Sequence, residues 1–162
     1  MKQRFKTYLT TLVAGCVFVA NAAAQEWPRF RGPNGTGVSP AKGIPSKFAL
    51  ADADWRVALK GEGHSSPVLW GDRIFVTGSD SKGVFTLQCL RAKDGSEEWS
   101  VSSPQSRHRI HRFNHLVSST PATDGERVVV VTSEAEAHHV TAYDFAGKKL
   151  WEKKFPTIIS NH

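Results

Sequence analysis

The sequence predicts an all-β protein: a partial β-propeller built of four-stranded antiparallel blades, with about two blades and the start of a third. Two observations predict this fold. The segment around Pro67 returns 54 residues later around Pro121 with the same Ser/Thr-Pro opening. Each copy is followed by short apolar runs that are separated by glycine-containing turns. A period of roughly 40 to 50 residues made of short strands is typical of propeller blades.

Residues 1–24 have the pattern of a secretory signal peptide. Basic residues precede an apolar run over residues 8–20, and three alanines end at Ala24. The apolar run is too short for a stable membrane span, so we expect cleavage after Ala24. The protein is therefore expected to be exported, to a periplasmic or extracellular location.

A competing interpretation of the same segment is lipidation at Cys16. Residues 13–16 read Val-Ala-Gly-Cys, which resembles a bacterial lipobox. Residues 17–20 remain apolar where a lipoprotein usually becomes polar, so we prefer cleavage after Ala24. We expect membrane contact only if Cys16 is lipidated.

Charge and cysteine content narrow the classes of partner. The chain has 21 basic and 15 acidic residues, and three of the basic residues lie in the signal peptide, so the mature net charge is +3. A net positive charge this small argues against a nucleic-acid partner. Cys89 would be the sole mature cysteine, which excludes an internal disulfide.

Residues 25–54 predict an irregular N-terminal arm, because prolines and glycines interrupt every regular pattern. Beyond the arm, three tryptophans each open a strand-like segment: Trp55, Trp99 and Trp151. They predict an incomplete propeller over residues 55–162. Its blades would span about 55–98 and 99–150, and a third would begin at 151.

The first blade contains a predicted hairpin, with strands at 67–70 and 73–77 around a Gly71-Asp72 turn. The segment 84–90 alternates in polarity as a half-buried strand does, and Asp94-Gly95 turns the chain toward Trp99.

The second blade repeats this order. An Asp124-Gly125 turn precedes the valine run at 128–131, and a strand at 140–143 leads to Gly147.

The end of each blade resembles the tryptophan-docking motif of the PQQ-like β-propeller repeat family. The first copy runs from Leu90 to Trp99, with Gly95 inside it, and the second ends at Gly147 and Trp151. The resemblance implies that the glycines form turns and that the tryptophans pack between neighbouring blades. The chain departs from the family at Asp94 and Ala146, where threonine is usual.

The opening Trp27-Pro-Arg-Phe-Arg-Gly-Pro-Asn-Gly35 is similar to the start of many secreted bacterial members, and the resemblance extends to about Phe155. It implies an architecture similar to that of the lipoprotein that assists outer-membrane protein assembly. A propeller needs roughly four to eight blades, so we expect this chain to be the N-terminal fragment of a longer protein.

Four candidate sites could carry chemistry, and we interpret each as structural. The histidines at 108–115, together with His138 and His139, are potential metal ligands. No cysteine or carboxylate lies among them at the spacing of a metal site. The arginines at 107, 109 and 112 beside Phe113 could form a phosphate-binding patch, and export argues against it.

Residues 32–37 resemble a phosphate loop, but prolines follow where a helix would be required. The remaining candidate is a triad of Ser118 or Ser119 with His115 and Asp124, which lacks a nucleophile elbow. We therefore predict no catalytic, cofactor-binding or metal-binding residue in this chain. The residues that matter are those of the structural repeat, namely Pro67, Gly95, Trp99, Pro121, Gly147 and Trp151.

The sequence thus favours an exported, non-catalytic PQQ-like propeller scaffold that mediates interactions with a protein or polymer. The alternative is the N-terminal part of a PQQ-dependent quinoprotein oxidoreductase. Two blades cannot surround a ligand on the propeller axis, so PQQ and calcium are expected only in a complete parent protein.

Overall fold

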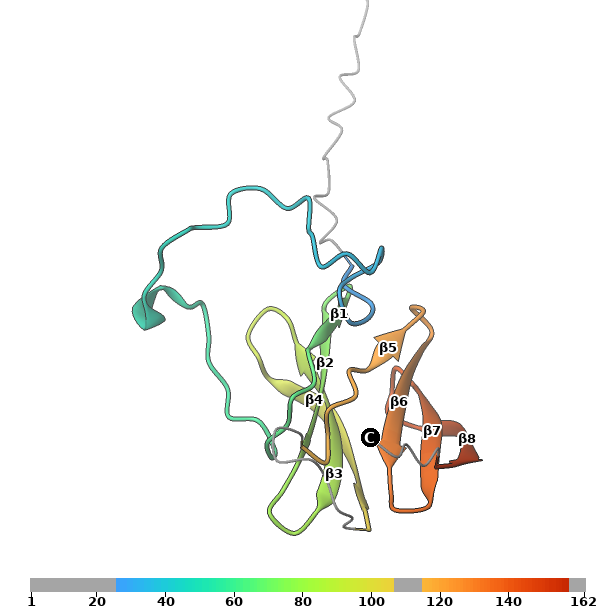
Figure 1. Ribbon diagram of the computed structural model, residues 1–162. Coiled ribbons are helices and arrows are strands. Elements are labelled where there is room, and N and C mark those ends of the chain that lie inside the picture. The colour runs from blue at the N-terminus through green and yellow to red at the C-terminus, as the bar shows by residue number, and fades with distance from the viewer. Residues whose placement is uncertain (1–25, 107–114, 158–162) are drawn as a thin grey trace, which may run out of the picture.

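The computed structural model describes residues 26–106 and 115–157, which form two four-stranded antiparallel sheets. The expected signal peptide and Cys16 lie outside these residues. In the first sheet the strand order is β1 (Val68–Trp70), β2 (Arg73–Ser79), β3 (Val84–Arg91) and β4 (Glu97–Pro104). In the second it is β5 (Ala122–Thr123), β6 (Arg127–Ser133), β7 (Ala137–Asp144) and β8 (Lys149–Pro156). Figure 1 shows the two sheets side by side, in agreement with the predicted partial propeller.

The sheet boundaries differ from the predicted blade boundaries. The strand at Trp99 closes the first sheet, since β4 pairs with β3, and the strand at Trp151 closes the second in the same way. The sheets therefore span 68–104 and 122–156, and the strand at Trp151 does not begin a third sheet. The stretch after Trp55, predicted to be a strand, joins neither sheet and is irregular. Trp99 and Trp151 therefore lie on the last strand of each sheet, whereas the sequence pattern predicts that they open the first strand of a blade.

Strand register places the core between the sheets. Phe75 on β2 pairs with Cys89 on β3, which pairs with Trp99 on β4, so these side chains share one face. That face packs against Val128 and Val130 of the second sheet. The rings of Phe75 and Phe145 are 5.2 Å apart across this boundary.

The start of the N-terminal arm joins the innermost strands of both sheets. Trp27 exchanges two backbone hydrogen bonds of 3.0 Å with Leu69 on β1, and the N–H of Thr123 on β5 donates to the carbonyl of Pro28 at 2.8 Å. The arm then leaves the sheets, as Figure 1 shows, and includes the short 3-10 helix η1 (Leu50–Asp52).

The irregular stretch after Trp55 covers the other face of the first sheet. Lys60 donates its backbone N–H to the side-chain oxygen of Gln88 at 2.7 Å, and its ammonium group pairs with Glu97. A side chain at Gly78 would collide with the carbonyl oxygen of Lys60 at 2.9 Å. Gln88 is 3% exposed as a result, although its position alternates with apolar neighbours.

The second sheet has an outward face that the described residues leave partly uncovered. Val129, Ala142 and Trp151 share this face by register, and they correspond to Phe75, Cys89 and Trp99 of the first sheet. All eight residues of β8 are exposed. Of the larger apolar side chains on this face, Val131 is 37%, Trp151 38% and Phe155 47% exposed.

Within the described part of the chain, helices are too short and too polar to qualify as membrane spans.

Candidate functional site

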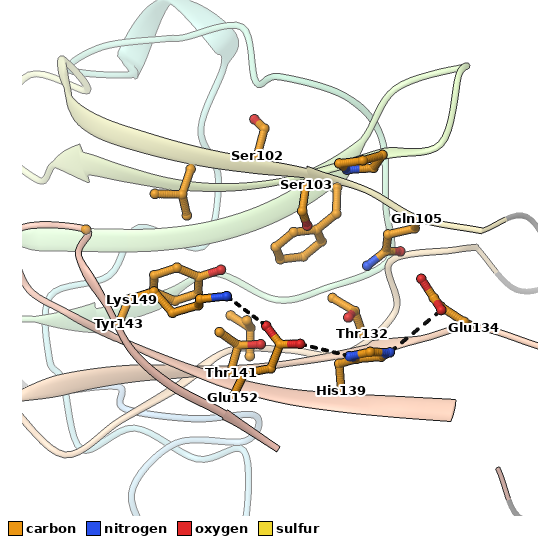
Figure 2. Close-up of a pocket in the computed structure, with 15 residues that line it drawn as sticks. Ser102, Ser103, Gln105, Thr132, Glu134, His139, Thr141, Tyr143, Lys149 and Glu152 are labelled. Carbon is orange, nitrogen blue, oxygen red and sulfur yellow. Dashed lines mark hydrogen bonds and ion pairs between the residues drawn. The ribbon is translucent and has the colours of Figure 1, made fainter. Parts of the chain in front are cut away.

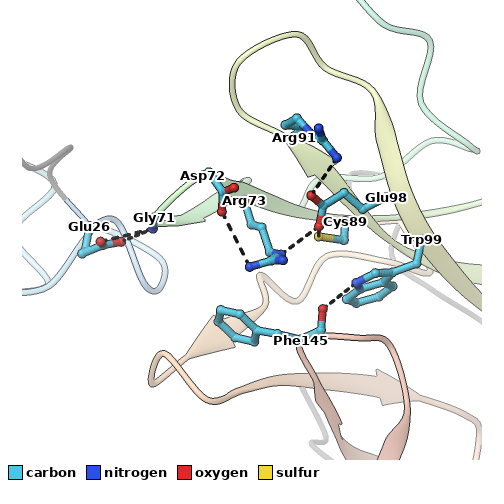
Figure 3. Close-up of polar contacts among 9 residues, drawn as sticks. All are labelled: Glu26, Gly71, Asp72, Arg73, Cys89, Arg91, Glu98, Trp99 and Phe145. Carbon is cyan, nitrogen blue, oxygen red and sulfur yellow. Dashed lines mark hydrogen bonds and ion pairs between the residues drawn. The ribbon is translucent and has the colours of Figure 1, made fainter.

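The candidate functional site is the boundary between the two sheets, where Trp99 of β4 lies against the turn before β8. The indole Nε1–H of Trp99 donates to the carbonyl of Phe145 at 2.8 Å, as Figure 3 shows. A Cβ at Gly147 would lie 2.9 Å from the indole ring. Gly147 also has a φ of +82°, which L side chains rarely adopt. Glycine is therefore required at position 147 for two reasons, the backbone conformation of the turn and the close approach of the indole ring.

The same contact occurs one repeat earlier. The indole of Trp55 donates to the carbonyl of Ala92 at 2.9 Å and lies against Gly95, whose φ is +71°. Trp55 reaches the first sheet from the irregular segment before β1, whereas Trp99 reaches the second sheet from a strand. The docking contact therefore does not depend on the conformation of the segment that carries the tryptophan.

A second indole at the boundary between the sheets was not predicted from the sequence. Trp70, at the end of β1, packs against Gly125 in the turn between β5 and β6. Asp124 stands at the corresponding position of the second repeat, so a search for repeated residues passes over Trp70. Its adjacency to the Gly71-Asp72 turn was the available signal, because residues beside a hairpin turn lie at the end of a sheet.

An ion cluster lies beside Trp99 on the first sheet, and Figure 3 shows its members. Arg73 donates from Nε to Glu98 at 2.8 Å, and Arg91 forms an ion pair with the same carboxylate at 3.3 Å. The hydrogen bond to Glu98 raises the pKa of Arg73. The guanidinium also lies 5.7 Å from the centre of the Phe145 ring, so it contacts both sheets.

Cys89 lies in the core next to this cluster and has no exposed surface. Burial, followed by the nearby Glu98 carboxylate, raises the pKa of the thiol to about 12. The thiol is therefore neutral at physiological pH and is a packing group in the folded protein.

The other predicted repeat residues differ between the two copies. Pro121 is fully buried, whereas Pro67 is exposed. Trp151 lies on the outward face of the second sheet rather than against a second glycine turn of the described residues. The two repeats therefore present equivalent residues to different surroundings.

The histidines singled out in the sequence are separated in the structure. His108 and His111 lie outside the described residues, as do Arg107, Arg109, Arg112 and Phe113. His115 lies beside His64, with ring centres 5.8 Å apart, while His138 contacts Ser133 at 2.9 Å. In the described part of the chain, no three His, Cys, Asp or Glu residues gather as a group that could hold a metal ion.

The two remaining candidates are engaged in local structure. Arg29 donates to the carbonyls of Gly32 and Pro33 at 3.2 and 2.7 Å, which closes the glycine-rich loop on itself. Ser118 Oγ donates to the carbonyl of His115, and Asp124 accepts from the backbone of its own turn. The backbone hydrogen bonds at that turn lower the pKa of Asp124.

Comparison with known proteins gives a family match and a similar solved structure. The family model described as "Outer membrane protein assembly factor BamB" matches residues 52–158, which is more than half of the chain. No curated protein matches. Among solved structures, this chain is similar to BamB from Moraxella catarrhalis, with 19% identity and a TM-score of 0.47. The match covers 62% of this chain and only 27% of that structure.

Proposed function

The chain belongs to the PQQ-like β-propeller repeat family whose model is described as outer membrane protein assembly factor BamB, and from this premise we propose that it is an exported, non-catalytic scaffold. Its role would be to hold sheets in a fixed relative position so that their turns and outer strands contact a protein or polymer. The family description supports a role in outer-membrane protein assembly, and we extend it to this chain as part of the proposal.

One observation carries the proposal. The repeated tryptophans serve packing. Trp55 and Trp99 each cover a glycine turn, and each donates its indole N–H to a carbonyl of that turn. The charged groups of the ion cluster pair with one another, since Arg73 and Arg91 both form ion pairs with Glu98. Side chains held in this way stabilise a surface rather than transform a substrate.

The turns between strands provide two rims on which a partner could bind. Lys82, in the turn between β2 and β3, and Glu136, in the turn between β6 and β7, are both exposed at one end of the sheets. Lys93 and Lys148 are exposed in the turns at the opposite end. Because antiparallel strands alternate in direction, each rim collects turns from both sheets.

Site-specific photo-crosslinking tests the scaffold role. A benzophenone amino acid is placed at Lys82 or Glu136 on one rim, and at Lys93 or Lys148 on the other, in the full chain expressed in its own cell envelope. We expect discrete adducts from one rim only, identified by mass spectrometry. A chain that yields no adduct from either rim would contradict the proposal.

Two further measurements separate the proposal from its enzymatic alternative. Titration of the full-length protein with PQQ and calcium should leave tryptophan fluorescence unchanged, whereas stoichiometric quenching would favour a quinoprotein oxidoreductase. Cell fractionation with mass spectrometry of the mature N-terminus tests export. A chain found in the cytoplasm with an intact N-terminus would overturn the exported part of the proposal.

A further inference from the structure

A cleft of about 390 Å³ lies between the two sheets and extends from Gly147, where Trp99 docks, to Gln105 and Glu134 at the other end. Phe85, Val101 and Val130 supply apolar lining, while polar groups gather toward Gln105 and His139. Figure 2 shows Gln105 on the side of the first sheet and His139, Glu134 and Glu152 on the side of the second. The volume is in the range of small-molecule sites in proteins.

Three polar atoms in this cleft are buried without a hydrogen-bond partner among the described residues. They are both side-chain amide atoms of Gln105 and the Nε2 atom of His139. The backbone N–H of Gln105 donates to the carbonyl of Gly83 at 3.1 Å, so the residue is anchored while its amide is not. Buried polar groups in folded proteins almost always have a partner, so these atoms are the groups of the cleft that could bond to a polar ligand.

The charges around these atoms restrict the chemistry of that ligand. Glu152 pairs with Lys149 and with His139 Nδ1, each at 3.1 Å, and these contacts lower the pKa of Glu152. Glu134 Oε2 lies 3.7 Å from His139 Nε2, within ion-pair distance of a protonated imidazole but too far for a hydrogen bond. Two carboxylates disfavour an anion, and the Lys149 ammonium disfavours a cation.

We propose that this cleft binds a neutral, hydroxyl-rich ligand, a saccharide unit of a polymer. The inference rests on the proposed scaffold role and names the ligand class for one of its surfaces. The Gln105 amide both donates and accepts, as does a pair of adjacent hydroxyls. A third hydroxyl reaches His139 Nε2, and the C–H face of the ring packs on Phe85 and Val101.

The test follows the side-chain NH₂ resonance of Gln105 in the full chain by ¹⁵N–¹H NMR. The probes are maltotetraose, cellotetraose and chitotetraose, at about 10 mM, roughly ten times a weak millimolar Kd. An acetylated and amidated tetra-alanine peptide is a fourth probe. We expect at least one saccharide to shift the resonance saturably, while the peptide does not.

Three variants locate the binding, and the backbone amide resonance of residue 105 reports it in the two variants that lack the glutamine side chain. Gln105→Leu removes the amide and should weaken saccharide binding by roughly tenfold or more. Lys93→Leu, a polar-to-apolar change at the opposite rim, should leave the affinity within about twofold of the original. Gln105→Glu preserves side-chain size, and it tests the loss of the two N–H donors if the leucine variant does not fold.

The saccharide proposal is overturned if the tetrapeptide alone shifts the resonance, or if none of the four probes does and the cleft holds only water. It is also overturned if Gln105→Glu and Lys93→Leu bind a saccharide equally well. These results leave crosslinking from the rims unaffected, so failure of this inference is distinguishable from failure of the scaffold role.

Discussion

Ser66 donates its backbone N–H to the hydroxyl oxygen of Thr120 at 3.0 Å, although the two residues are 54 positions apart and occupy the same place in successive repeats. Equivalent points of the two sheets therefore meet at their inner strands, where β1 contacts β5. Sheets that meet in this way are related by rotation about a common axis, which is the geometry of a propeller.

Removing this acceptor should loosen the inner contact. We expect Thr120→Val to lower the free energy of unfolding by about 1 kcal/mol, because the half-buried N–H of Ser66 loses its partner. Thr120→Ser retains the hydroxyl and is the matched control. Urea unfolding followed by fluorescence measures both, and equal stability of the two variants would show that the hydrogen bond contributes nothing.

Equivalent tryptophans should differ in their contribution to stability. Trp99→Ala removes a ring that packs between the sheets and should cost about 3 to 5 kcal/mol. Trp151→Ala removes a ring that is 38% exposed and should cost less than half as much. Chemical denaturation of the full chain gives both values. A loss as large for Trp151 as for Trp99 would mean that the outward face is covered in solution.

Gly147 should be less tolerant of a side chain than Gly71, although both have positive φ angles. Gly147→Ala carries the cost of a left-handed backbone, about 1 to 2 kcal/mol, and also a collision with Trp99. Gly71→Ala carries only the backbone cost, since a Cβ there meets nothing within 4 Å. Thermal unfolding compares the two variants, and an equal decrease in Tm would remove close docking as the reason for glycine at 147.

The strands could be predicted because their signals are local. Turn residues bound each hairpin, and the segment 84–90 alternates in polarity over nearly the full length of β3. The fold class could be predicted from the repeat, because a sequence pattern that recurs at this period predicts the same structural unit at each copy.

The assignment of strands to sheets could not be predicted in the same way. A tryptophan that docks on the next sheet belongs to two units at once, so its sequence position fits the end of one blade as well as the start of another. Trp55 shows the difficulty, because it docks like Trp99 without belonging to a strand. The cleft at Gln105 was also missed, since its lining comes from segments about thirty residues apart that carry no motif.

Cys89 should make the stability of the chain fall at alkaline pH. The folded thiol has its pKa raised to about 12 by burial, whereas an unfolded cysteine titrates near 8.5. Between these values the unfolded state releases a proton that the folded state retains. Stabilisation from the buried neutral thiol is complete below about pH 8.5 and is lost as pH rises toward 12, with a slope of at most about 1.4 kcal/mol per pH unit.

Urea unfolding at several pH values from 7.5 to 10 tests this prediction, with Cys89→Ala as the control. The variant should be less stable at pH 7.5, because it leaves a cavity in the core, but its stability should fall less steeply with pH. Alkylation by iodoacetamide gives a second measurement, in which peptide mapping distinguishes Cys89 from Cys16. Native Cys89 should react orders of magnitude more slowly than the urea-unfolded thiol. Parallel pH profiles for the two proteins, together with rapid native alkylation, would place the thiol in contact with solvent.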